Sequence, residues 1–269
     1  MPNYAKDYRL SEMMCVAAAH QIQDGERVFA GAGLPLLASI LALRAHAPNI
    51  EICLESGVVG ALFPEDPLKG KSPLPRFVMD PRICPGATYR SGLLEVNGLF
   101  LPKRKFDVGF LGGAQVDRYG NLNSTLIGDN WVSPKVWLPG SGGAGEIAMY
   151  ANRVLIIMAP HDKRRFCEKV DMITSPGYLN GPGSREAHGL KWGGPAAVVS
   201  TLGVLGFDPE SKEMTLKSVY PGVTVKQVKE DTAWDLRVAP GVDEVEPPTV
   251  EEIEIIRTVD REGLYTGRG

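Results

Sequence analysis

Cysteine is scarce in this 269-residue chain, and long apolar runs and an excess of positive charge are both missing. The four cysteines lie far apart and form no Cys-x-x-Cys pair, which argues against a disulfide framework or a zinc site and favours a reducing compartment. The longest apolar stretch, residues 34–45, contains Ser39 and Arg44 and is too short to cross a bilayer. The first residues, MPNYAKDYRL, lack the apolar segment of a signal peptide, so a cytoplasmic location is expected.

The charge balance also excludes a class of partner. The formal net charge is -3 and the sequence pI is about 5.9, so the chain has no basic footprint of a nucleic-acid-binding protein. Its hydrophobic fraction of 43% is ordinary for a globular protein and allows a sizeable core. Small molecules or another protein are therefore the expected partners.

Helices and strands alternate from the first residues onward. A helix is predicted from Ser11, as its cap, to about Gln23, then a strand at 27–31, a helix at about 35–46 and a strand that ends at Glu55. Further strands are predicted at 106–112, 135–138, 154–158, 196–200, 204–207 and 214–219, and helices at about 146–151, 225–232 and 250–260. This order predicts an α/β fold with an open, mostly parallel sheet covered by helices.

No linker divides this pattern, so residues 1–269 are predicted to form a single domain. The exception to its regularity is a proline-rich excursion at about 58–104. A long irregular connection inside a compact domain is usually functional, and this one directly follows Glu55. It is expected to lie beside the site, with a plain surface loop as the alternative.

The Gly31-Ala-Gly33 turn after the predicted strand at 27–31 does not make a nucleotide-binding motif. Position 36, where a third glycine would stand, is Leu, and Pro35 falls inside the motif. A ribose-binding acid at the usual distance is also missing, so a nicotinamide cofactor is not expected.

The stretch Ile50–Gly57 places a carboxylate where ligands bind in α/β folds. Ile50, Ile52 and Leu54 alternate with Glu51 and Cys53, and Ser56-Gly57 then breaks the strand. Glu55 would stand at the carboxyl end of the strand, at the rim of the sheet. The alternative is a solvated glutamate at a strand end.

Two glycine-rich turns could supply backbone N–H donors. One is Gly112-Gly113-Ala114 after the strand at 106–112, and the other is the run at 139–145, which leads into a short helix. A flexible linker is the alternative for the second, although strands flank it. The basic run Lys163–Arg165 could hold a phosphate or be a solvated face.

Glutamate beside such turns permits two kinds of chemistry. The carboxylate could act as a nucleophile on an activated acyl group, while the N–H groups stabilise the oxyanion that develops. It could instead act as a general acid or base.

An ordered set of motifs along nearly the whole chain resembles the β subunit of family I coenzyme A (CoA) transferases. The motifs are Gly31-Ala-Gly33-Leu-Pro, Glu55-Ser-Gly57, Gly112-Gly-Ala-Gln-Val-Asp-Arg-Tyr-Gly-Asn121, Asn123-Ser-Thr, Ile127-Gly-Asp129, Gly140-Ser-Gly-Gly-Ala144, Lys163-Arg-Arg-Phe166, Thr174-Ser-Pro-Gly177, Leu202-Gly-Val204, Tyr220-Pro221 and Asp235. Any one glycine motif would be weak, whereas the ordered set is specific.

The resemblance implies the CoA-transferase (NagB/RpiA-like) fold and a defined site. It assigns Glu55 as the nucleophile that carries CoA as a glutamyl thioester. It places Gly142, Gly143 and Ala144 near CoA and the oxyanion, and Gly113, Ala114 and Gln115 at the rim of the site. It implies CoA as a substrate, no permanently bound cofactor and no metal. A separately encoded α subunit is the implied partner, and a dicarboxylic acyl group the implied substrate.

Other interpretations of Glu55 stay open. Relatives on the same fold hydrolyse cyclic acyl-CoA rings or decarboxylate enoyl-CoA, but those lack the glutamate at this position. A sugar-phosphate isomerase could use Glu55 as a base, and a catalytically silent scaffold subunit is a further alternative. Cys53 falls on the same strand face as Glu55, where it is either a buried inert thiol or a participant in modified chemistry.

Overall fold

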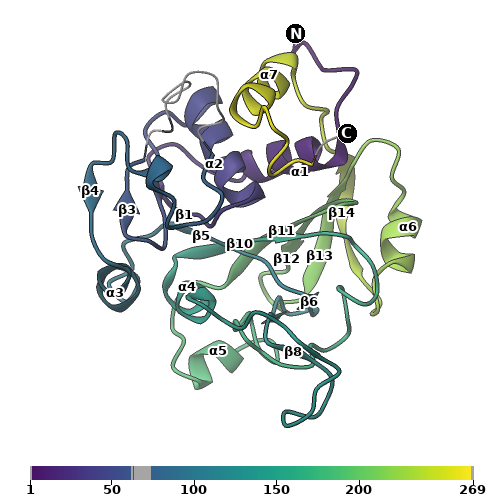
Figure 1. Cartoon of the computed structure of the whole chain (residues 1–269). Helices are drawn as coiled ribbons and strands as arrows, with labels where there is room; N and C mark the ends of the chain where they lie inside the picture. The colour runs from purple at the N-terminus through teal and green to yellow at the C-terminus, as the bar shows by residue number, and fades with distance from the viewer. Residues whose placement is uncertain (1, 62, 64–73, 268–269) are drawn as a thin grey trace. The chain divides into compact units, whose positions relative to one another are not determined.

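The computed structural model describes residues 2–61, 63 and 74–267 of the chain. It contains two compact units, residues 1–110 with 247–269 and residues 111–246, and each contains both strands and helices (Figure 1). The prediction of one domain over residues 1–269 stays a prediction. Part of the proline-rich segment, residues 62 and 64–73, lies outside the described residues.

The strands of the first unit pair in both parallel and antiparallel fashion. Strand β1 (Arg27–Phe29) pairs in parallel with β2 (Glu51–Cys53) and with β5 (Val108–Leu111). Beyond β2 the sheet continues antiparallel through β3 (Val58–Val59) and β4 (Tyr89–Arg90). The rest of the described proline-rich segment forms short helical turns: η1 (Pro81–Ile83), α3 (Leu93–Glu95) and η2 (Val96–Phe100).

Three helices of this unit pack on one another: α1 (Leu10–Ala19), α2 (Leu34–Ala45) and α7 (Val250–Val259). Glu12 on α1 is fully buried and accepts hydrogen bonds from Arg257 on α7 and from Arg9. Burial alone would raise the pKa of Glu12, but the hydrogen bonds from the two arginines outweigh it and lower the pKa to about 2. This buried carboxylate therefore ties the two ends of the chain together.

The start of α1 differs from the prediction. Arg9, not Ser11, is the cap, because the Glu12 side chain reaches back to the Arg9 N–H at 2.7 Å. The Ser11 hydroxyl instead donates to the Thr266 carbonyl at 2.6 Å. Helix α7, predicted at about 250–260, begins with a capping box, in which the Thr249 N–H donates to the Glu252 side chain and the Glu252 N–H donates to the Thr249 hydroxyl.

A tight hairpin joins β2 to β3. The Leu54 N–H donates to the Val58 carbonyl at 2.9 Å, and the Gly57 N–H donates to the Leu54 carbonyl at 3.0 Å. Gly57 has φ +97°, and a Cβ on it would lie 2.1 Å from the Ser91 carbonyl oxygen. The hairpin therefore requires glycine for two independent reasons, its backbone conformation and the close approach of Ser91.

The second unit is built on the long strand β10 (Arg153–Met158), which pairs in parallel with β11 (Pro195–Ser200). The antiparallel strands β12 (Gly203–Phe207) and β13 (Met214–Val219) follow, and β14 (Arg237–Glu244) adds in parallel to β13. The predicted strand pair at 204–219 is confirmed. The helices are α4 (Ala144–Tyr150), α5 (Ser184–Ala187) and α6 (Val225–Glu230), the last capped by the Thr224 side chain.

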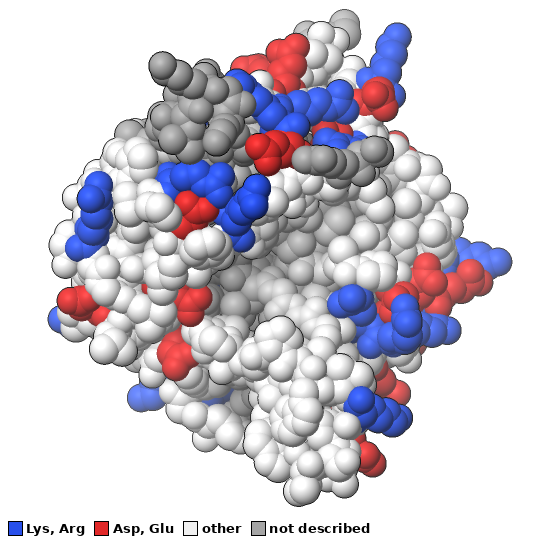
Figure 2. All heavy atoms as spheres, in the orientation of Figure 1, with Lys and Arg blue, Asp and Glu red and all other residues white. Residues whose placement is uncertain are grey.

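Two small two-stranded sheets complete this unit. Strand β6 (Gln115–Val116) pairs with β7 (Leu122–Asn123), and β8 (Leu126–Ile127) pairs with β9 (Val136–Trp137). A turn at Asp117–Asn121 joins the first pair. Among the described residues no helix is long and apolar enough to span a bilayer. On the face shown in Figure 2, basic and acidic side chains are interspersed.

His161 follows β10 and is buried in the second unit. One ring nitrogen lies 2.8 Å from the Ser200 hydroxyl, the other lies 3.0 Å from the Thr232 hydroxyl, and the ring stacks on Phe166. Burial lowers the pKa of His161 to about 4, against a weaker opposing effect of Asp162. The imidazole is therefore neutral at neutral pH and serves the core.

We expect Gly57→Ala to destabilise the chain by roughly 3–5 kcal/mol, because the new Cβ overlaps the Ser91 carbonyl. The matched control is Gly25→Ala, at a glycine with φ +81° and nothing within 4 Å, which should cost only about 1–2 kcal/mol. Urea unfolding measures both. Equal losses for the two variants would show that the Ser91 contact has no effect.

The buried His161 predicts a pH dependence of stability. Its folded pKa of about 4 lies below the unfolded value of about 6.5, so the unfolded chain binds the extra proton between these values. Stability should be complete above pH 6.5 and fall by up to roughly 3 kcal/mol as the pH drops to 4. His161→Gln should flatten this part of the pH profile in urea unfolding, whereas His188→Gln, at an exposed position, should keep it. An unchanged slope in His161→Gln would contradict the assignment.

Candidate active site

Glu55 stands in the hairpin turn of the first unit. Strand β2 ends at Cys53, so Glu55 lies two residues beyond the strand and not at its last position as predicted. The reason is the hairpin itself, since the Leu54 N–H closes on Val58 and Glu55 falls in the loop. The side chain is half-buried, and its carboxylate is carried by a loop that Gly57 and Ser91 hold fixed.

Cys53 is buried beneath this turn and is a structural thiol. Burial is the largest cause that raises the pKa of Cys53 to about 12, and the charge of Glu51 adds to it. The Sγ atom lies 3.6 Å from the Glu51 carbonyl oxygen. A protonated, enclosed thiol is a poor nucleophile, so the geometry favours an inert Cys53.

The first glycine turn of the second unit is fixed by Asn123. The Ala114 N–H donates to the Asn123 carbonyl at 2.8 Å, and a Cβ on Gly113 would lie 2.9 Å from the same oxygen. The Gln115 side-chain carbonyl accepts from the Asn123 amide at 2.7 Å and from the Asp171 N–H at 3.0 Å. Gln115 is thus a buried residue that holds the rim of the turn.

The second glycine turn is hydrogen-bonded to Ser124, the residue that follows Asn123. The Gly140 N–H donates to the Ser124 carbonyl at 2.8 Å, and the Ser124 hydroxyl donates back to the Gly140 carbonyl at 2.9 Å. Since Asn123 and Ser124 are adjacent, the structure brings together two glycine turns that are well separated in the sequence. Helix α4 begins at Ala144, two residues earlier than predicted.

Only some of the predicted N–H donors are available. The Ala114 N–H is used by Asn123, and the Ala144 N–H donates to the Ser141 carbonyl at 2.9 Å. Within the described part of the chain, the Gly113 and Gly142 N–H groups make no hydrogen bond. Gly142 is exposed and Gly113 is half-buried, so these two glycines are the better candidates for contact with a ligand.

The Asp117–Asn121 turn has a structural role. Asp117 is buried and accepts hydrogen bonds from the Tyr119 and Asn121 N–H groups and from the Asn121 amide. Asn121 in turn holds the loop at Gly177, where a Cβ would lie 2.3 Å from the Gly120 carbonyl carbon. Burial raises the pKa of Asp117 above its ordinary value, because it outweighs these hydrogen bonds. This network fixes the loop behind the first glycine turn.

Arg185 was missed from the sequence. Its buried guanidinium donates only to backbone carbonyls: Pro176 at 3.0 Å, Gly177 at 2.8 Å, Ala148 at 3.2 Å and Trp192 at 2.8 Å. It thereby connects α4, which follows the second glycine turn, to the loop at Gly177. A single arginine outside any motif gave no sequence signal of this role.

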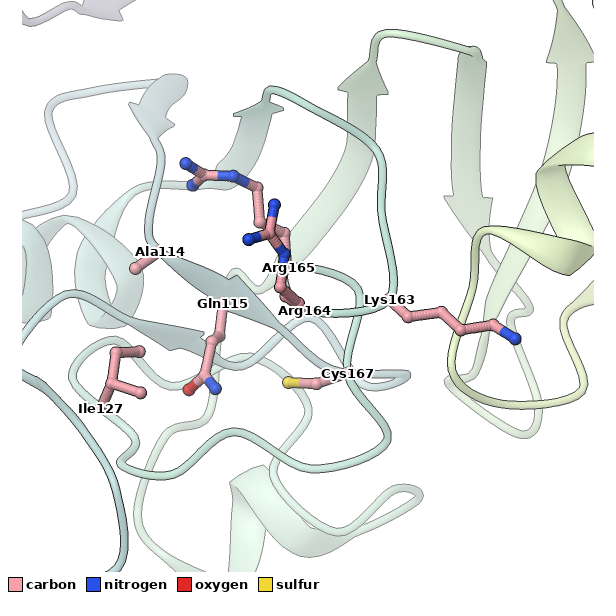
Figure 3. A pocket seen from close by; sticks show the side chains of 7 residues that line it. All are labelled: Ala114, Gln115, Ile127, Lys163, Arg164, Arg165 and Cys167. Atoms are coloured by element: carbon pink, nitrogen blue, oxygen red, sulfur yellow. The ribbon is translucent and has the colours of Figure 1, made fainter. Parts of the chain in front are cut away.

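The basic run lies on a pocket that two of the predicted site residues also line. The pocket has a volume of about 550 Å³ and is lined by Ala114, Gln115, Ile127, Lys163, Arg164, Arg165 and Cys167. The Arg165 guanidinium lies 3.5 Å from the Gly113 carbonyl oxygen. In Figure 3 the two arginine side chains extend in the same direction, while Lys163 extends away from Gln115 and Cys167.

Glu55 lies in the first unit, and the six backbone-donor candidates lie in the second. Among the described residues, no three His, Cys, Asp or Glu side chains are grouped as metal ligands would be. The first unit presents a carboxylate on a hairpin, and the second unit presents two glycine turns held on one buried segment. A carboxylate permits nucleophilic or general acid–base chemistry, and backbone N–H groups at such turns can bind an anion.

Known proteins are similar to this chain over most of its length. The family model for coenzyme A transferase matches residues 11–231. The B subunit of glutaconate CoA-transferase from Acidaminococcus fermentans is 42% identical over 257 residues, which cover 93% of this chain and 92% of that protein. The B subunit of 3-oxoadipate CoA-transferase from Pseudomonas knackmussii is 40% identical over 253 residues, which cover 94% of each.

A solved structure shows the same architecture. The crystal structure of glutaconate CoA-transferase from Acidaminococcus fermentans matches with a TM-score of 0.88 and 37% sequence identity, over 99% of this chain and 100% of that chain. The predicted α/β fold class is confirmed by this match. The chain belongs to the coenzyme A transferase family.

Proposed function

We propose that this chain is the β subunit of a heteromeric CoA-transferase that moves CoA between a dicarboxylic acyl-CoA and a free carboxylate such as acetate. The observation that carries the proposal is the placement of Glu55 on the rigid Leu54–Val58 hairpin, in a chain 42% identical to one subunit of a glutaconate CoA-transferase. Both relatives described above act on dicarboxylates by name. The proposed acyl substrate therefore carries a second carboxylate.

The proposed reaction proceeds by covalent catalysis at Glu55. The Glu55 carboxylate attacks the thioester carbonyl, the carbon–sulfur bond breaks, and the CoA thiolate leaves a mixed anhydride. The thiolate then attacks the glutamyl carbonyl of the anhydride, which breaks its carbon–oxygen bond, releases the first carboxylate and forms a glutamyl-CoA thioester. A second carboxylate reverses these steps. No net oxidation occurs, and the thioester energy is kept throughout.

The glycine turns have a defined part in this proposal. Each attack puts negative charge on a carbonyl oxygen, which preorganised N–H donors stabilise. Gly113 and Gly142 are the donors of choice, because the Ala114 and Ala144 N–H groups are used within the second unit. Gly143 and Gln115 remain part of the proposed CoA and oxyanion site as the residues that shape the two turns.

The proposal includes a separately encoded α subunit. The names of both relatives describe one subunit of an enzyme, which implies a second kind of chain in those enzymes. We infer that this chain likewise assembles with an α subunit, and that the complete substrate pocket includes residues of both. Activity is therefore to be measured on the co-expressed pair.

We expect Glu55→Gln and Glu55→Ala to lower the rate of CoA exchange by at least about a thousandfold, because the covalent intermediate cannot form. The measurement is transfer between glutaryl-CoA or glutaconyl-CoA and acetate. Glu51→Gln is the matched control, since Glu51 lies on the same hairpin but is paired with Arg27 at 2.6 Å. That variant should keep most of the exchange activity.

Trapping gives an independent readout of the same proposal. Incubation with acyl-CoA followed by borohydride or hydroxylamine should modify the peptide that contains Glu55 in the wild type, and leave it unmodified in Glu55→Gln. Retention of most exchange activity by Glu55→Ala would refute the assignment of Glu55 as the nucleophile. Hydrolysis of the acyl-CoA without exchange would assign the chain to a hydrolase reaction instead.

A further inference from the structure

We propose that the pocket lined by Lys163, Arg164 and Arg165 binds the phosphate groups of the CoA substrate. This inference rests on the proposed function, because it concerns the same substrate. It assigns a role to the basic run Lys163–Arg165, which takes no part in the covalent chemistry proposed for Glu55. We name this pocket, with its lining residues Ala114, Gln115, Ile127, Lys163, Arg164, Arg165 and Cys167, the basic pocket.

The charge of the basic pocket favours an anion. Three of its seven lining residues are cationic and none is acidic. The nearby acid Asp162 accepts the Arg164 N–H at 2.9 Å and the Arg165 N–H at 3.1 Å through one oxygen, and the Arg164 guanidinium at 3.1 Å through the other. The Arg164 side chain is 89% exposed, so this ion pair is weak and the guanidinium can turn to a ligand.

The backbone of the basic run is anchored on both sides, while the charged groups of the Lys163 and Arg164 side chains are exposed to solvent. His161 before the run is anchored by Ser200 and Thr232, and Phe166 after it is fully buried. Within the run the Arg165 carbonyl accepts the Val116 N–H at 2.7 Å. The fold thus fixes the backbone from which three cationic side chains project, the two arginines in one direction and Lys163 in another (Figure 3), which reduces the entropy lost when an anion with several charged groups binds.

The remaining lining residues suit the uncharged part of CoA. Ala114 and Ile127 offer apolar surface, and Gln115 offers an amide edge. Cys167 adds a neutral thiol, since burial and the charges of Asp117 and Asp171 raise the pKa of Cys167 to about 12. The pocket therefore combines apolar and cationic surface, as a nucleotide joined to a pantetheine arm requires (Figure 3).

Phosphate is a better match than the second carboxylate of the acyl group. Lys163 and Arg164 are exposed, and adjacent hydrated cations match a group that carries several negative charges on several oxygens. A single carboxylate is recognised best by one enclosed arginine in bidentate geometry. Arg165, half-buried and 3.5 Å from the Gly113 carbonyl, is instead held toward the glycine turn.

Binding measurements on the co-expressed pair test the assignment without turnover. The ligands are CoA, dephospho-CoA, adenosine 3′,5′-bisphosphate and pantetheine, measured by titration calorimetry. The double variant Lys163→Gln/Arg164→Gln should raise the Kd for CoA and for adenosine 3′,5′-bisphosphate about tenfold, since two exposed charge pairs are lost. The matched control, Lys169→Gln/Arg237→Gln, removes two charges that do not line the pocket and should leave both Kd values within about twofold.

Two further comparisons identify the group that is bound. The double variant should leave the weak binding of pantetheine unchanged, because pantetheine has no phosphate. A smaller effect of the variant on dephospho-CoA than on CoA would assign the 3′-phosphate, and an equal effect would assign the diphosphate; either supports the proposal. The double variant could instead lose as much affinity for pantetheine thioesters of dicarboxylic acids as for CoA, and none for thioesters of monocarboxylic acids. That result would overturn the phosphate assignment in favour of the acyl carboxylate.

The proposed function and this inference fail in different ways. Normal CoA affinity in the double variant overturns the phosphate site even if Glu55→Gln abolishes exchange. Exchange that survives in Glu55→Gln overturns the nucleophile even if the double variant binds CoA weakly. An equal loss of CoA affinity in the control variant would show a general charge effect and also overturn the assignment of this pocket.

Discussion

The requirement that buried polar groups be paired determines the shape of the second unit around Asn123 and Ser124. Asn123 is fully buried, and its side-chain amide donates to Gln115 and to the Leu126 carbonyl at 2.6 Å. Its own backbone carbonyl accepts Ala114, while Ser124 exchanges two hydrogen bonds with Gly140. Two glycine turns that belong to different parts of the sequence are thereby held on one dipeptide, and the backbone N–H groups they expose are preorganised.

The first unit achieves the same rigidity by close packing of backbone. Glu55 is carried on a loop, as functional residues often are. That loop packs closely on another segment, because the Ser91 carbonyl lies where a Cβ at position 57 would be. The Ser91 N–H also donates to the Gly57 carbonyl at 2.8 Å. In the proposed mechanism, a carboxylate fixed in this way loses little entropy when it meets an acyl group, which favours covalent catalysis.

Residues that are neighbours in the sequence take separate roles in the fold. His161 precedes the basic run by two positions, yet it is buried, neutral and stacked on Phe166. Lys163 and Arg164 stand in water. The difference arises because β10 enters the core and the chain leaves it at Asp162, whose carboxylate caps the turn. The turn at Asp162, and not the local sequence, therefore determines which of these residues are buried and which are exposed.

The sequence by itself determined the family, the α/β class, the main elements and the candidate carboxylate, because apolar periodicity, capping boxes and ordered glycine motifs are local signals. It placed α1, β2 and α4 within a few residues of their observed bounds, and it singled out Glu55, the two glycine turns and the basic run as candidates. Only the tertiary structure decided that Ser11 is no cap, that Asn123 and Ser124 join the glycine turns, and that Arg185 braces α4. These contacts join different segments of the chain, and they depend on which polar groups become buried together, a property that no local pattern encodes.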